Sequence, residues 1–253
     1  MQRSRTFGWA ILFPLFLLAA GPAWVRADDA AKIRVLIVTG NDYPGHVWKE
    51  TTPAVRQILE QDPRMIVRVI EDPEFLASPA LDQYDLVVLN YMNWESPDPS
   101  RAAAEHLQRF VQQGKGLVLL HFSCGAWSGW PEFEKLAGRV YDKDQTHDPH
   151  GPFRVDIVNQ DHPVTRGLES FETVDELYFC LTGEQPITVL ATAHSNVTGQ
   201  DHPMAFVLQY GTGRVFHTPL GHDVKAFTLP GPAELIRRGC AWAAGQEPVT
   251  APK

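Results

Sequence analysis

The sequence predicts a single α/β domain built on a mainly parallel β-sheet. Short, almost uniformly apolar segments alternate with amphipathic helical segments, and the apolar segments end at glycine or polar residues. Such strands lose the usual polar–apolar alternation because helices cover both faces of a parallel sheet. With 253 residues, 44% of them hydrophobic, the chain can form one such domain with a substantial core.

The first half of the chain contains the clearest elements. Its predicted strands share runs of apolar, often β-branched residues: 33–39, 65–70, 85–90 and 116–120. Helices are predicted over 47–60 and 101–113, and Gly114 ends the second of them.

The second half has shorter apolar segments separated by turn-rich loops. Strands are predicted at 153–158, 177–181, 187–191, 204–209 and 214–218. A closing helix is predicted over 233–244, and residues 248–253 are predicted to form a frayed tail. No internal repeat or second domain is visible, so residues 28–247 are predicted to form the whole folded domain.

The first 27 residues resemble a signal peptide. Arg3 and Arg5 precede an apolar run over 9–20, and Ala27 ends a small-residue exit before Asp28. The alternative is a retained membrane anchor, but the run is shorter than the roughly 20 residues needed to cross a bilayer. We therefore expect a secreted or periplasmic protein with no stable membrane insertion after cleavage.

The charge of the chain restricts its partners. Loss of Arg3, Arg5 and Arg26 with the signal peptide changes the formal charge from -8 to -11, since no acidic residue is lost. An acidic domain is a poor partner for nucleic acid or an anionic membrane surface. A neutral small molecule such as a sugar is compatible with this charge, and the formation of homo-oligomers is left open.

Several histidines follow predicted strands. His46 comes after the first strand and His121 ends the fourth, so both are expected at the sheet edge where ligands of such folds bind. Further histidines lie in loops or at a strand end: His147, His150, His217 and His222. The alternative for each is a hydrogen-bonded structural histidine.

A cluster of ionisable groups lies within the segment Asp175-Glu176-Leu177-Tyr178. If the segment is extended, Glu176 and Tyr178 point the same way, because alternate residues of a strand share a face. Glu176 is then a candidate acid, base or metal ligand, and Asp175 could brace a loop. The alternative is an acidic strand entry that faces water.

Aromatic residues are frequent in the predicted edge loops. Tyr43, Trp94 and Trp127 are candidate substrate-binding residues, because an apolar sugar face packs on an aromatic ring beside polar groups. Core packing is the alternative.

Cys124, which precedes a glycine, suggests a nucleophile elbow, although the end of the strand places His121 at that position instead. The three cysteines could be buried thiols or include one disulfide.

Eight motifs, in order, resemble the ThuA-like (trehalose utilisation) family over about residues 32–246. They are Gly45-His46, the segment 114–121 ending in His121, His147-Asp-Pro, the segment 161–168, Asp175-Glu176-Leu-Tyr178, the segment 210–218, Leu220-Gly221-His222 and the segment 239–245.

The resemblance implies a flavodoxin-like three-layer fold of the class I glutamine amidotransferase-like type. It also implies that His121 replaces the amidotransferase nucleophilic cysteine, so glutaminase activity is not expected. The family is associated with trehalose-type sugars and 3-keto sugar intermediates. The site residues carried over are His46, His121, His147, Glu176 and His222, with Asp175 and Tyr178 in support.

These observations lead to three hypotheses. The first is a sugar hydrolase or lyase in which His121 and Glu176 transfer protons. In it, His46, Asp175 and Tyr178 contact substrate, and a divalent metal such as zinc is held by His46, His121, His147 and His222. The second is a non-catalytic sugar-binding domain that serves a partner enzyme. The third is a cysteine-dependent amidase that uses Cys124.

Overall fold

The computed structural model describes residues 32–249. The predicted signal peptide lies outside the described residues, as do residues 250–253. Between residues 32 and 249, no helix combines the length and the apolar character needed to cross a membrane.

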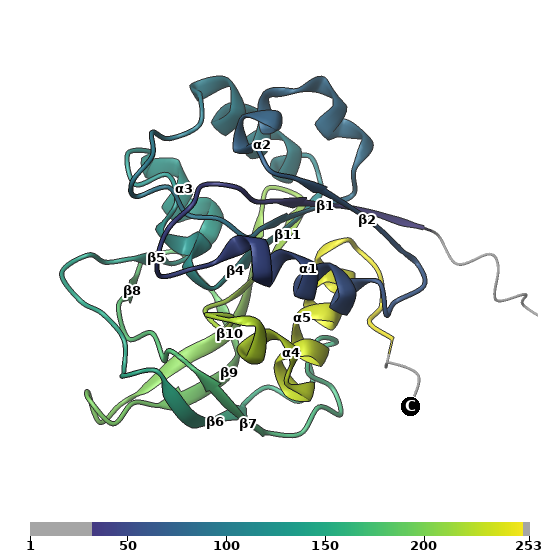
Figure 1. Ribbon diagram of the computed structural model, residues 1–253. Coiled ribbons are helices and arrows are strands. Elements are labelled where there is room, and N and C mark those ends of the chain that lie inside the picture. Colours follow the sequence, from purple (N-terminus) through teal and green to yellow (C-terminus); the bar gives the residue numbers. More distant parts are fainter. Residues whose placement is uncertain (1–31, 250–253) are drawn as a thin grey trace, which may run out of the picture. The chain divides into compact units, whose positions relative to one another are not determined.

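A nine-stranded sheet forms the centre of the domain (Figure 1). Five neighbouring strands run parallel, in the order β2 (Met65–Ile70), β1 (Ile33–Val38), β3 (Leu86–Leu89), β4 (Gly116–Leu120) and β11 (Gly213–Thr218). Four antiparallel strands extend it, in the order β10 (Asp201–Tyr210), β9 (Thr188–His194), β6 (Gly151–Ile157) and β7 (Phe171–Asp175).

The parallel strands are buried on both faces. In β1, Val35 and Ile37 pack into one core cluster while Leu36 and Val38 pack into the other. This division follows from the two-residue period of a strand. Because both sets are apolar, the strand shows no alternation in sequence, as expected for a sheet with two covered faces.

Helices on each face complete three layers. One core cluster includes residues of α1 (Trp48–Leu59), α4 (Val224–Thr228) and α5 (Pro230–Ala243). The opposite cluster includes residues of α2 (Arg101–Gln112) and α3 (Pro131–Ala137). The three-layer α/β architecture with its mainly parallel core confirms the predicted fold class.

Smaller elements connect these layers. A two-stranded sheet pairs β5 (Val140–Tyr141) with β8 (Leu181–Thr182), and short 3-10 helices span Pro73–Ala77, Pro79–Gln83 and His121–Gly125. The last described residues bond to the domain, because Arg64 donates a hydrogen bond to the carbonyl of Glu247 and Arg237 to that of Val249.

Agreement with the predicted elements differs between the two halves. The strands and helices of the first half match within two residues at each end. In the second half, the predicted strand over 177–181 is wrong, because the strand is Phe171–Asp175. Of the predicted segment, Leu181 pairs in β8 and Tyr178 forms an isolated bridge with His147. Leu177, Tyr178 and Cys180 are apolar or aromatic because their side chains are buried in the core, and not because they lie in a ladder.

Candidate active site

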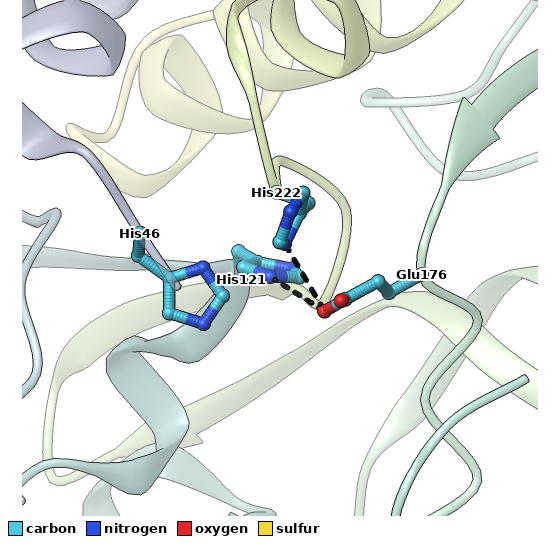
Figure 2. Close-up of side chains that lie close together, drawn as sticks. All are labelled: His46, His121, Glu176 and His222. Atoms are coloured by element: carbon cyan, nitrogen blue, oxygen red, sulfur yellow. Dashed lines mark ion pairs between the residues drawn. The ribbon is translucent and has the colours of Figure 1, made fainter. Parts of the chain in front are cut away.

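Four ionisable side chains from distant parts of the sequence meet in one cluster, shown in Figure 2: His46, His121, Glu176 and His222. His46 lies in the loop between β1 and α1, and His121 directly follows β4. His222 lies in the loop between β11 and α4, while Glu176 directly follows β7. The cluster therefore forms beside the carboxyl ends of parallel strands, where α/β sheets commonly bind ligands.

The distances within the cluster are short. Glu176 Oε2 lies 3.2 Å from His222 Nδ1 and 3.5 Å from His121 Nε2. The ring centre of His46 is 4.8 Å from that of His121 and 5.0 Å from that of His222. One nitrogen or oxygen of each of the four side chains lies within 4.8 Å of the others.

His121 is held in one orientation by both of its ring nitrogens. Its backbone φ of 46° is in the left-handed region, which turns the chain sharply at the end of β4. Nδ1 lies 2.8 Å from the carbonyl oxygen of Pro219 and must donate a proton to it. In the neutral ring, Nε2 is then an acceptor, and the Tyr178 hydroxyl donates to it at 2.8 Å.

Asp175 fixes the backbone around two members of the cluster. Its Oδ1 accepts hydrogen bonds from the amides of Glu176 at 2.8 Å and His222 at 3.1 Å, and its Oδ2 accepts from Gly221 at 2.7 Å. The side chain is fully buried, and burial raises its pKa. The expectation that Asp175 contacts substrate is therefore wrong, since its carboxylate is buried and bonded to backbone amides.

The cluster holds its protons unequally. Burial would raise the pKa of Glu176, but the facing imidazoles of His121 and His222 hold it well below its usual range. Burial and the neighbouring imidazoles lower the pKa of His46 to about 2. The adjacent carboxylate of Glu176 raises the pKa of His222. Near neutral pH the cluster thus contains a carboxylate at Glu176, a neutral imidazole at His46 and an easily protonated imidazole at His222.

The donor set fits a divalent transition metal. A tetrahedral zinc ion with bonds of about 2.1 Å places its ligand atoms roughly 3.4 Å apart, close to the two Glu176 distances. Within residues 32–249, the buried Nδ1 of His46 has no hydrogen-bond partner, and the Nδ1 of His222 faces the carboxylate of Glu176. The hydroxyl of Tyr178 competes for the lone pair of His121 Nε2, so it would have to turn away if that nitrogen bound an ion.

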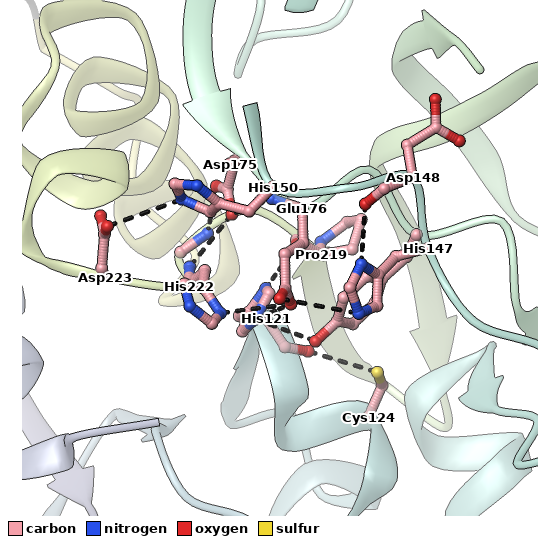
Figure 3. Close-up of polar contacts among 12 residues, drawn as sticks. His121, Cys124, His147, Asp148, His150, Asp175, Glu176, Pro219, His222 and Asp223 are labelled. Atoms are coloured by element: carbon pink, nitrogen blue, oxygen red, sulfur yellow. Dashed lines mark hydrogen bonds and ion pairs between the residues drawn. The ribbon is translucent and has the colours of Figure 1, made fainter. Parts of the chain in front are cut away.

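The structure changes the predicted ligand set at one position. His147 Nε2 faces the other oxygen of Glu176 at 3.6 Å, while its Nδ1 hydrogen-bonds to the carbonyl of Asp148 (Figure 3). His147 therefore lies beside the cluster and Glu176 takes its place within it. His150 extends the histidine group outward, with its ring centre 5.1 Å from that of His222 and its Nε2 3.6 Å from Asp223.

Only some of the predicted aromatic residues lie near the cluster. Tyr43 contacts His46, with ring centres 5.7 Å apart, and Trp94 reaches the cluster through Phe122. Trp127 is buried against Phe133 in the core cluster beneath α2 and α3, so the structure does not bring it to the histidines. Sequence reasoning missed Phe122, although its position directly after His121 was a usable signal.

Cys124 is unsuited to act as a nucleophile. Its side chain is buried, its thiol donates to the carbonyl of His121 at 3.2 Å, and burial raises its pKa well above the usual value. A reactive cysteine needs an accessible thiolate. All three cysteines are free and buried, which excludes a disulfide among them in this structure.

The fold and the site define a three-layer α/β protein in which a histidine cluster lies at the carboxyl ends of the parallel strands. The chain belongs to the ThuA family, described as trehalose utilisation, which it matches over residues 34–243. This membership supports a carbohydrate-related role. A search of curated proteins finds no match.

Solved structures with the same fold include two ThuA-like proteins. One, from Parabacteroides merdae, is 27% identical with a TM-score of 0.76, and the match covers 88% of this chain and 94% of that one. The other, from Bacteroides uniformis, is 21% identical with a TM-score of 0.69, covering 85% and 92%. A β-galactosidase from Bacillus circulans sp. alkalophilus shares the fold at 14% identity and a TM-score of 0.59, covering 86% of this chain and 32% of that one.

Proposed function

We propose that this protein is a secreted or periplasmic enzyme that cleaves a trehalose-type glycoside or its 3-keto derivative. The convergence of His46, His121, His222 and Glu176 at a ligand-binding sheet edge is the observation that supports catalysis. The family's association with trehalose supports the substrate class. The signal-peptide pattern of residues 1–27 supports the location.

The roles of the residues follow from their protonation. His121 Nε2 is the base, because the bond from Nδ1 to Pro219 leaves Nε2 as the acceptor; the Tyr178 hydroxyl that donates to it has to turn away before the proton is taken. His222 is the acid, because Glu176 favours its protonated form. Glu176 stays a carboxylate that orients the rings of His121 and His222. In the predicted proton transfer it can therefore accept a proton but has none to donate.

A 3-keto sugar suits these roles. The ketone acidifies the hydrogen on carbon 2, which His121 removes as the bond from carbon 1 to the glycosidic oxygen breaks. His222 then protonates the departing oxygen, so the proton count balances. A divalent cation bound by all four side chains would polarise the carbonyl of the substrate, but it would occupy the nitrogens of His121 and His222 and so replace their base and acid roles.

The test is cleavage of trehalose and of a 3-keto-disaccharide by the purified protein, followed by mass spectrometry. Wild type should cleave the 3-keto-disaccharide and not trehalose, which has no ketone to acidify carbon 2, and Glu176→Gln should reduce the rate at least a hundredfold. Glu172→Gln is the matched control, because Glu172 is an exposed carboxylate on β7 near the site residue. Binding of the sugars without any cleavage would instead support the non-catalytic sugar-binding domain.

A further inference from the structure

A hollow lies next to the histidine cluster, and the proposed reaction does not use it. Its volume is about 400 Å³, within the range of small-molecule sites. It is formed by the loop after β3, the segment from η4 (His121–Gly125) to α3, and the strands β5 and β8. Trp94, Trp130 and Tyr141 are among its lining residues.

Only one aromatic ring separates this hollow from the cluster. The ring centre of Phe122 lies 4.7 Å from that of His46 and 4.5 Å from that of Trp94. Trp94 in turn lies 5.2 Å from Tyr141, and its Nε1 donates to the carbonyl of Gly125 at 2.9 Å, which fixes the indole. The hollow and the cluster therefore lie on either side of the Phe122 ring, close enough for the two rings of a disaccharide to occupy one each.

The lining suits a neutral polyol with an apolar face. Three aromatic side chains supply flat surfaces, and Asp142, Lys143 and Glu134 supply both acceptors and donors. Lys143 Nζ lies over the ring of Trp94, 4.9 Å from its centre, so an ammonium donor shares the face on which a sugar would stack. The buried Nε1 of Trp127, which also lines the hollow, has no hydrogen-bond partner within the described part of the chain.

We propose that this hollow is a second sugar subsite, which binds the ring of a disaccharide that leaves during cleavage. This inference rests on the proposed function and names the form of its substrate: two linked pyranose rings, with the reacting ring at the histidine cluster. Aromatic stacking on Trp94 is the main interaction that the second ring would gain.

The test compares kcat/KM for a 3-keto-disaccharide with that for the methyl 3-keto-glucoside, which has the same reacting ring but no second one. Trp94→Leu should lower the value for the disaccharide about tenfold more than the value for the methyl glycoside. Trp94→Phe keeps an aromatic face and should retain most of the preference. Trp242→Leu is the control, since Trp242 packs with the core cluster on the other sheet face.

The outcomes separate the two proposals. If wild type cleaves both substrates and Trp94→Leu lowers both values equally or neither, the subsite is wrong and the proposed function stands. If wild type cleaves neither substrate, the proposed function fails and the subsite proposal fails with it. Circular dichroism of each variant checks that its fold is intact.

Discussion

The two halves of the domain contribute equally to the candidate site but are built differently. Residues 33–125 form four parallel strands and supply His46 and His121. Residues 140–222 form the antiparallel part of the sheet, with β11 joining the parallel part, and supply Glu176 and His222. The site therefore exists only when both halves are folded together.

The halves also position their residues by different means. In the first half, His121 is placed by the end of a buried strand and a sharp turn with a φ of 46°. In the second half, a single buried carboxylate, Asp175, holds the backbone of both Glu176 and His222. We expect the position of His121 to tolerate single substitutions, because a whole buried strand sets it. We expect the positions of Glu176 and His222 to be lost with one substitution, because the Asp175 side chain holds both.

The largest effect should come from Asp175→Ala. The change leaves the amides of Glu176, Gly221 and His222 without their acceptor, which should cost about 3–5 kcal/mol in the free energy of unfolding. Urea denaturation measures this loss. The free energy of unfolding of Asp175→Asn should lie between those of Asp175→Ala and wild type, because one acceptor oxygen remains.

Asp201→Ala is the matched control. Asp201 is an exposed aspartate paired with His194, so its loss should change stability by less than about 1 kcal/mol. Equal effects of the two substitutions would show that Asp175 does not tie the second half of the site together.

A smaller effect on stability should come from His217, a histidine buried in the core outside the cluster. His217 is fully buried on β11, and burial lowers its pKa to about 4 from an ordinary value of 6.5. The unfolded chain therefore takes up a proton first as pH falls, so this contribution to stability is complete above pH 6.5 and is lost between pH 6.5 and 4.

The substitution His217→Asn tests that sign. Its side-chain amide can still donate to the carbonyl of Ala137, as Nδ1 of the histidine does. The difference in unfolding free energy between wild type and variant should narrow by about 2 kcal/mol between pH 7 and pH 5. A constant difference across that range would mean that His217 is not held neutral by burial.

The sequence predicted the first half of the site for sound reasons. His46 and His121 each follow a buried strand, and parallel strands end at one edge, so their meeting needed no long-range information. Glu176 and Tyr178 do both lie within 3.5 Å of His121, but the predicted strand that justified this is absent.

The remainder depended on tertiary contacts that no local pattern encodes. The separation of Trp127 from the histidines depends on its packing in the core, and the outward position of His147 on its hydrogen bond to the carbonyl of Asp148. The role of Asp175 depends on the amides of Gly221 and His222, about 46 residues away in the chain. Such pairings appear only when the second half has folded against the first.

The most direct test of the central claim is elemental mass spectrometry of purified protein that carries no histidine tag and has met no chelator. One residue from each half is replaced, in His46→Ala and His222→Ala, and His194→Ala serves as an exposed control. The account predicts near-stoichiometric divalent metal in wild type and control, and a loss of most of it in both cluster variants. Metal that stays bound in either cluster variant, or no metal in wild type after incubation with zinc, would contradict a centre shared by the two halves.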